Sequence, residues 1–343
     1  MPSAPRTPTP AVSKSRPRGP TGTPGRARGQ TLRGPKGRAF DVQQWGIILV
    51  LIVLVIVLSI FARGFLSPRN IRNVLQQVST LGILSMGMTV LMVSGGIDLS
   101  VGSAISVVAV VAGTMLKAGI PAELAIIAGL GIGCLIGCIN GLLAAYTRAS
   151  PFILTLGTMT ALQGVSIIIT QGFPITNLGK RFEWIGGAMI GQIPFIVILF
   201  FFVMLICGFG LRYLRIGRIA YAIGGNENTT YLAGISVKRY KILFYVICGF
   251  FAGTAGLVLS SRISSAIPTM GAGFEMNAIA AAVIGGIPLT GGKGNVWGTL
   301  TGVLLLGIIA NGLNLLHVDA SWQYVVTGLI IVLAVIIHEH RGK

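Results

Sequence analysis

The chain has 343 residues, of which 53% are hydrophobic and only 10% are charged, and its formal net charge is +18. A soluble domain carries about 25% charged residues, so this chain has too few charges to cover a folded surface in water. The composition argues against a soluble enzyme of two domains. The high apolar content argues equally against disorder over the whole length.

The first 41 residues differ from the rest in composition. Nine of the 26 Lys and Arg residues fall within the first 40 positions, together with eight prolines and no acidic residue. A segment without apolar periodicity buries too little surface to offset its ordering entropy. We therefore predict a disordered, basic, Pro/Gly-rich cytoplasmic tail over 1–41. Half of the net charge belongs to it, which weakens the interpretation of the charge as a nucleic-acid surface.

Apolar runs of membrane-spanning length follow the tail. The first, from Val42 to Ala62, is 21 residues without a charge, and about 20 apolar residues span a bilayer core. We predict an all-α polytopic membrane protein over 42–343 with about ten transmembrane helices, some of them broken or short. The predicted spans are 44–62, 75–95, 99–116, 124–146, 151–171, 193–211, 242–261, 276–290, 296–316 and 320–338. The second and third spans, and the eighth and ninth, are separated only by short glycine-containing breaks.

The distribution of Lys and Arg predicts the orientation. With both termini in the cytoplasm, 19 of the 26 basic residues lie on the cytoplasmic side and 7 on the other. Cytoplasmic loops of membrane proteins carry such an excess. The margin without the tail is 10 to 7, so the tail contributes most of the bias.

Glycine is abundant, with 49 residues, and two runs place it on one face of a helix. Small residues let transmembrane helices approach closely, so we predict packing surfaces here rather than phosphate-binding loops. The glycines of the two faces are Gly129, Gly133 and Gly137 in one helix, and Gly249, Gly253 and Gly256 in another.

An internal repeat is visible in the two breaks. The string GGIDLSVGS at 95–103 resembles GGIPLTGGK at 285–293, and each follows one apolar helix and precedes another. Interrupted helices at matching places in transporter folds point to the transport path. Chance similarity between glycine-rich strings is the alternative.

The sequence contains no recognisable catalytic or metal-binding motif. No Ser or Cys has an obvious base nearby, and no Cys and His cluster has zinc spacing. The string GGKGN fails the phosphate-loop pattern, because Ile287 stands where the first glycine belongs. We therefore expect no enzyme activity, no metal and no cofactor bound by this chain. The four cysteines are expected to be small buried apolar residues.

The longest cytoplasmic loop, 212–241, is predicted to contain a short helix. Asn226 suits its N-cap, Glu227 its first turn and Gly234 its end. A small helix presented to the cytoplasm is a docking element, and an ordinary connecting loop is the alternative.

Polar residues within the spans are candidates for a translocation path. Asp98 is the sharpest, because an acidic residue in a membrane is costly and is by default a functional hypothesis. Capping of the helix that follows Asp98 is an equally good interpretation, and most of the other residues could simply bond one helix to another. The path candidates are Asp98, Ser100, Asn140, Thr155, Gln163, Asn277 and Asn311.

Several long strings carry a family resemblance over about 42–341. GGIDLSVGS, SPFILTLGTMTALQGV, AYAIGGNENTTYLAGISVKRYK and the segment from Asn277 to Leu316 resemble permease subunits of bacterial sugar ABC importers, the ribose/xylose/arabinose/galactoside group. The basic tail has no counterpart in the family pattern.

The resemblance implies the partners and the location. It implies a bacterial plasma (inner) membrane, a second permease copy (identical or homologous), a separate ATPase that uses ATP, and an extracytoplasmic sugar-binding protein. It makes 212–241 a coupling loop whose ATPase-coupling residues are Gly225, Asn226, Glu227, Ala233 and Gly234. Three basic residues on the outer side are candidate contacts for the binding protein: Lys180, Arg181 and Arg262. A self-sufficient secondary transporter or channel is the alternative from another class.

Overall fold

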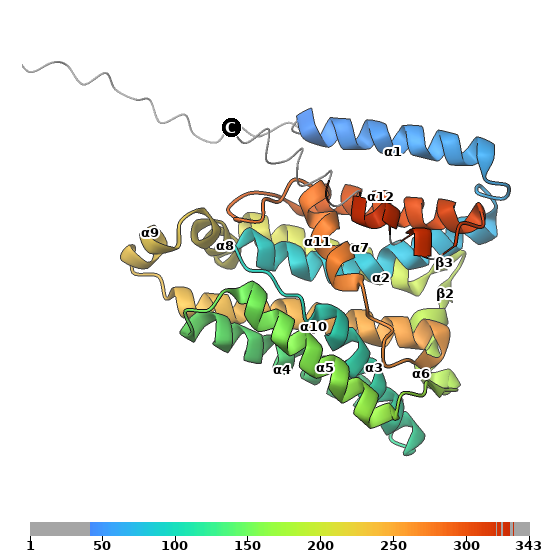
Figure 1. Ribbon diagram of the computed structural model, residues 1–343, viewed down its shortest axis with the longest axis horizontal. Coiled ribbons are helices and arrows are strands. Elements are labelled where there is room, and N and C mark those ends of the chain that lie inside the picture. Colours follow the sequence, from blue (N-terminus) through green and yellow to red (C-terminus); the bar gives the residue numbers. More distant parts are fainter. Residues whose placement is uncertain (1–41, 320, 324, 330–331, 333–343) are drawn as a thin grey trace, which may run out of the picture. The chain divides into compact units, whose positions relative to one another are not determined.

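A computed structural model describes residues 42–319, 321–323, 325–329 and 332. The predicted tail and much of the predicted span 320–338 lie outside these residues. The described part is predominantly helical (Figure 1). Its elements are α1 (Val42–Phe61), α2 (Pro68–Val93), α3 (Val101–Lys117), α4 (Ala122–Tyr146), α5 (Pro151–Thr170), β1 (Ile175–Thr176), α6 (Lys180–Gly187), β2 (Met189–Ile190), β3 (Ile193–Pro194), α7 (Phe195–Tyr213), α8 (Arg215–Gly225), α9 (Glu227–Leu232), α10 (Val237–Ile263), β4 (Ser265–Ala266), α11 (Phe274–Ile284) and α12 (Val296–Leu315).

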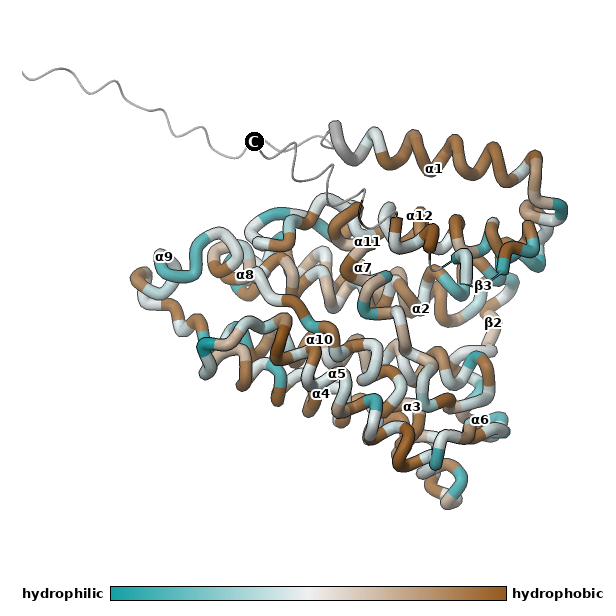
Figure 2. Tube along the Cα trace, viewed as in Figure 1, coloured by the Kyte–Doolittle hydropathy of each residue, from teal (hydrophilic) through white to brown (hydrophobic). Residues whose placement is uncertain are grey.

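Six helices of the described part are long and apolar enough to cross a membrane, namely α2, α4, α5, α7, α10 and α12. Figure 2 shows hydrophobic residues along these helices and hydrophilic ones at α9, at α6 and at several turns. Three further apolar helical stretches are shorter, namely α3, α11 and the stretch Trp45–Phe61 within α1. The chain is therefore a multi-pass, predominantly helical membrane protein.

The predicted span 276–290 is wrong in its extent. Helix α11 has 11 residues and ends at Ile284, so it rises about 16 Å, roughly half of a bilayer core. Its end is a Schellman motif, in which Gly286 N donates to Val283 O at 2.9 Å and Ile287 N donates to Ala282 O at 3.0 Å. Gly286 has φ +92°, a backbone conformation that favours glycine.

Helix α2 ends in the same motif, which bears on the internal repeat. Gly95 has φ +81°, and the N–H groups of Gly95 and Gly96 donate to Met92 O and Leu91 O. In the first string the glycine with positive φ is Gly95, the first of the two consecutive glycines. In the second string it is Gly286, the second of the two. The two copies share a way of ending a helix, with an offset of one residue from the sequence alignment.

Helices α2 and α10 form the centre of the core. Of the residues in the most apolar stretch of each helix, 78% are buried in α2 and 67% in α10, but only 11% in α5. Ile83, Leu84 and Met86 of α2 have no exposed surface. Helices α7, α10, α11 and α12 all pack against α2, so α2 lies inside the bundle.

The two predicted glycine faces are packing surfaces: they meet each other, except that Gly256 of α10 packs against the backbone of Ile105 of α3. A Cβ added to Gly133 of α4 would lie 2.5 Å from Gly249 O and 3.0 Å from Gly253 Cα of α10. A Cβ added to Gly137 would overlap the backbone of Tyr245. The backbones of α4 and α10 approach this closely because glycine has no side chain there.

Short strands and α6 gather where α5 and α10 end. Strand β1 pairs antiparallel with β4 through Ile175↔Ala266 and Thr176↔Ser265, and β2 pairs with β3. Ser261 Oγ of α10 donates to Phe182 O at 2.6 Å and accepts from Gly186 N at 2.8 Å. This end of α10 is thus bound to α6, while its other end meets α9.

Candidate functional site

The loop 212–241 contains the predicted short helix. The Asn226 side chain accepts a hydrogen bond from Thr229 N at 2.9 Å and caps α9. Glu227 is the first residue of α9, and Gly234 has φ +80° two residues after its last residue. The prediction of a helix between a cap at Asn226 and an end at Gly234 is confirmed.

The same loop contains α8, which the sequence interpretation missed. Gly217, Ile219, Ala220 and Ile223 are buried, and Arg218 is exposed. Such a helix has an apolar stripe and a polar face. Its 11 residues begin at Arg215, two residues after α7 ends at Tyr213, and the sequence interpretation places this segment in a loop.

An ion pair fixes α9 to α10. Lys241 Nζ donates to the two carboxylate oxygens of Glu227 at 2.7 and 2.6 Å. The apolar side chains of Tyr231 and Leu232 are 69% and 83% exposed. Next to them lies an open groove lined by Arg215, Ala233, Gly234, Ile235, Ser236, Arg239, Tyr240 and Leu243. Exposed apolar residues beside a basic groove are suited to contact another protein.

Four of the predicted path residues are brought together around the break after α2. Asn140 Nδ2 of α4 donates to Asp98 Oδ1 and Oδ2 at 3.2 and 3.1 Å, and to Ser100 Oγ at 2.7 Å. Asp98 Oδ1 also accepts from Ser100 N at 2.8 Å and Ser100 Oγ at 2.7 Å. Thr155 Oγ1 of α5 accepts from Leu99 N at 3.2 Å. All four side chains are buried.

The role of Asp98 differs from the capping that the sequence suggested. The N-cap of α3 is Ser100, which makes no side-chain capping bond. Asp98 instead binds the backbone two residues ahead, as in an Asx-turn, and binds α4 through Asn140. Asn140 Oδ1 has no hydrogen-bond partner within the described part of the chain. The arrangement holds the break 94–100 to α4 and α5.

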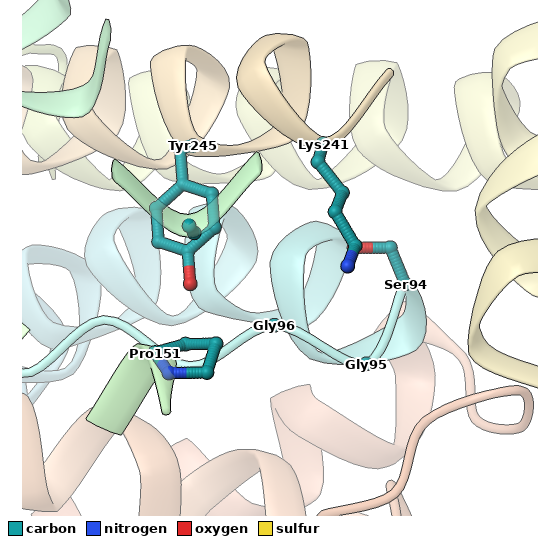
Figure 3. A pocket seen from close by; sticks show the side chains of 7 residues that line it. Ser94, Gly95, Gly96, Pro151, Lys241 and Tyr245 are labelled. Carbon is teal, nitrogen blue, oxygen red and sulfur yellow. The ribbon is translucent and has the colours of Figure 1, made fainter. Parts of the chain in front are cut away.

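Helix α10 contacts the same break from the other side. Tyr245 OH donates to Ile97 O at 3.0 Å. Tyr245 and Lys241, four residues apart on α10, both point toward the backbone of Gly95 and Gly96 across a small pocket (Figure 3). Lys241 therefore lies between the break and its ion-pair partner Glu227 on α9.

The two breaks meet at the end of α8. Gly292 N of the second break donates to Val93 O of α2 at 2.9 Å. Tyr221 OH of α8 donates to Gly294 O at 2.7 Å. Burial raises the pKa of the Tyr221 hydroxyl, so it keeps the proton that it donates. The loop helices and the interrupted segments are therefore in direct contact.

The other predicted path residues lie elsewhere. Gln163 Nε2 of α5 donates to Pro268 O at 2.9 Å. Asn277 of α11 is half-buried. Asn311 of α12 exchanges two hydrogen bonds of 2.9 Å with Asn70 of α2. That reciprocal pair joins one helix to another, so Asn311 is bound to α2 rather than grouped with Asp98.

The three basic residues proposed for the outer side lie on α6 and at the end of α10. Lys180 is exposed at the start of α6. Arg181 pairs with Glu123 of α4 at 3.2 Å, with side chains 82% and 58% exposed. Arg262 is half-buried beside Gly186. An ion pair this exposed contributes little to stability, which leaves Arg181 available to a partner.

The sequence interpretation missed Tyr221, Lys241 and Tyr245. Tyr221 and Lys241 lie in the string AYAIGGNENTTYLAGISVKRYK that carries the family resemblance, and Tyr245 follows that string. None of the three is a helix-capping residue or part of a break. Their roles come from hydrogen bonds to residues 73, 14 and 148 positions away. The only signal in the sequence was the spacing of Lys241 and Tyr245, which places them on one face of a helix.

Comparison with known proteins gives one family and several relatives. Residues 70–335 match the sequence model of a family described as "Branched-chain amino acid transport system / permease component". The chain is 43% identical to the ribose import permease protein of Bacillus subtilis (strain 168), over 88% of this chain and 94% of the relative. It is 39% identical to the ribose import permease protein of Escherichia coli (strain K12), over 89% and 98%. It is 35% identical to the L-arabinose ABC transporter permease protein of Azospirillum brasilense, over 88% and 88%. No solved structure matches.

Proposed function

Since the chain belongs to this family of transport-system permease components, we propose that it is the membrane subunit of an ATP-binding-cassette importer for a monosaccharide, with ribose as the first candidate. The observation that carries the proposal is that relatives matched over 88% or more of their length are named for ribose import and for an L-arabinose ABC transporter. Hydrolysis of ATP belongs to a separate subunit, and this chain binds no cofactor of its own.

The α8–α9 element is the proposed ATPase-docking surface. It presents the exposed Tyr231 and Leu232 and the groove that contains Arg215 and Arg239. Gly225, Asn226, Glu227, Ala233 and Gly234 form the turns that shape it. An ATPase surface with an apolar pocket and acidic residues would complement both features.

The proposed orientation places α8 and α9 in the cytoplasm of a bacterial inner membrane, with both termini on that side. The basic residues around α8 and α9 agree with it. Adding α1, α3 and the segment 320–338 to the six long helices gives nine membrane crossings, and α11, which rises only about half of a bilayer core, would be a tenth, short span. On the opposite side, Lys180, Arg181 and Arg262 would meet acidic residues of an extracytoplasmic sugar-binding protein.

A second permease copy completes the proposed importer. Helix α5 is the least buried of the six long helices, yet it carries the exposed Thr160 and the half-buried Thr158 and Gln163, of which Gln163 also binds Pro268 O within the chain. Polar side chains in transmembrane helices usually face the bundle interior or a water-filled cavity. A translocation path between two α5 helices would give these side chains such an environment.

Uptake into proteoliposomes tests the proposal. The permease is reconstituted with its ATPase and its binding protein, and radiolabelled ribose, arabinose and leucine are supplied with or without ATP inside. We expect ATP-dependent uptake of a sugar. Selective uptake of leucine would support the amino acid named in the family description, and uptake without ATP or ATPase would support a self-sufficient transporter or channel.

A further inference from the structure

We propose that the glycine contact between the end of α8 and the two interrupted segments transmits the movement of the ATPase to the helices α3 and α12. The contact consists of Gly224 of α8, Gly95 of the first break, and Gly291 and Gly292 of the second, and we name it the glycine junction. This inference rests on the proposed function, since it assigns the route by which the docking element acts.

The junction is a backbone-to-backbone contact of three segments that are far apart in the sequence. A Cβ added to Gly224 would overlap Val93 O and Gly292 N. A Cβ added to Gly291 would lie 2.5 Å from Gly95 N, and one added to Gly292 would lie 2.9 Å from Gly225 Cα. Glycine permits this approach because it has no side chain. No flexible side chain therefore separates α8 from either break, and a displacement of α8 reaches both breaks directly.

Two tyrosine hydroxyls reinforce the connection. Tyr221, three residues before Gly224, holds Gly294 O at 2.7 Å. Asn295, the next residue, caps α12 by accepting from Gly298 N at 2.9 Å. The first break is held in the same manner by Tyr245, which binds Ile97 O. The first break is thus bound to α10 and continues into α3. The second break is bound to α8 and continues into α12.

The polar cluster makes the first break rigid enough to transmit a displacement. Asp98, Ser100 and Asn140 are joined by hydrogen bonds of 2.7 to 3.2 Å. Helix α3 begins at Val101, directly after Ser100. Packed and hydrogen-bonded segments carry energetic coupling between distant sites when they move between discrete arrangements. The glycine junction therefore links α9, through α8, to the first turns of α3 and α12.

The test compares variants that disturb the junction with variants that do not. Gly224→Ala forces the contact apart, and Tyr221→Phe removes one hydroxyl without changing the packing volume. The matched controls are Gly210→Ala in α7, where a Cβ has its nearest neighbour at 4.0 Å, and Tyr213→Phe, whose ring is 58% exposed. Each permease is reconstituted with its ATPase and binding protein, and radiolabelled ribose uptake and ATP hydrolysis are measured together.

We expect Gly224→Ala to lower the number of sugars imported per ATP about tenfold, and Tyr221→Phe to lower it about threefold. The amount of ATPase that co-purifies with the permease stays unchanged in both, which separates loss of transmission from loss of docking. The two controls keep the wild-type ratio. If Gly224→Ala fails to accumulate in the membrane, the ratio of imported sugar to hydrolysed ATP in Tyr221→Phe decides whether the inference holds.

Two results would overturn the inference. One is a wild-type ratio of sugar to ATP in Tyr221→Phe and Gly224→Ala. The other is a loss of co-purified ATPase that accounts for the whole defect, because the residues would then serve docking alone. Failure of the wild-type complex to import sugar with ATP would instead overturn the proposed function, so the two failures are distinguishable.

Discussion

Lys241 Nζ donates hydrogen bonds to both carboxylate oxygens of Glu227, at 2.7 and 2.6 Å, and thereby ties the first turn of α9 to α10. The same lysine lies beside Gly95 and Gly96 in the pocket of Figure 3. The ion pair therefore sits between the surface proposed for the ATPase and the interrupted segment inside the bundle. This position leads to the first prediction.

Glu227→Gln is expected to weaken coupling without unfolding the permease. The Glu227 side chain is 52% exposed, and exposed ion pairs contribute only about 0–1 kcal/mol to stability. The melting temperature in detergent should therefore hardly change, while ATPase stimulation by the sugar-loaded binding protein falls about threefold or more. Glu123→Gln, which breaks the ion pair with Arg181 on α6, is the control. Equal ATPase stimulation in the wild type, Glu227→Gln and Glu123→Gln would contradict a coupling role for Glu227.

Asp98→Ala is expected to destabilise the permease. It removes the acceptor for Ser100 N, Ser100 Oγ and Asn140 Nδ2, all of them buried. A buried donor without a partner costs about 1–3 kcal/mol, so the melting temperature in detergent should fall. Asn277→Ala is the comparison, because no hydrogen bond of the Asn277 side chain is present in the described part of the chain. A melting temperature as high as that of the wild type would show that the cluster does not hold the break in place.

Gly133→Ala is expected to separate α4 from α10. The added methyl group would meet Gly249 O and Gly253 Cα, and overpacking of this kind costs about 1–3 kcal/mol. Gly131→Ala is the matched control two residues away, because a Cβ there meets nothing within 4 Å. The amount of folded permease in the membrane, measured by fluorescence-detected size exclusion, should fall for Gly133→Ala alone. Equal yields would mean that the glycine seam adapts to a methyl group.

Asn70 and Asn311 are expected to act as one unit. They exchange two hydrogen bonds, so Asn70→Leu and Asn311→Leu each leave a buried amide without its partner. A double-mutant cycle on unfolding should give a coupling energy of about 0.6 kcal/mol and at most about 1.7 kcal/mol, the average and the maximum measured by such cycles for hydrogen bonds between membrane helices. Additive effects of the two substitutions would instead indicate that the pair contributes no specific energy.

Local features of the fold could be predicted from the sequence. The cap at Asn226 and the end at Gly234 bound α9, and the glycine faces pack as expected, because each depends on residues within a few positions of one another. The extent of α11 could not be predicted, because apolar composition continues through Ile287 while the backbone turns at Gly286.

The relationships within the candidate site were beyond a reading of the sequence. Asp98, Ser100, Asn140 and Thr155 were singled out as separate polar residues, but their grouping depends on how α3, α4 and α5 pack. The approach of Gly224 to Gly95 and Gly292 joins segments separated by more than 60 positions. Neither spacing nor composition carries that information, and glycine pairs occur at many other places in this chain.

Sugar uptake with and without the ATPase subunit tests the central claim most directly. Proteoliposomes containing the permease, its ATPase and internal ATP are supplied with the binding protein and radiolabelled ribose, and a parallel set lacks only the ATPase. The account predicts accumulation of sugar against its gradient in the first set and none in the second. Equal uptake in both sets would contradict it, because the permease would then move its substrate without a separate ATPase.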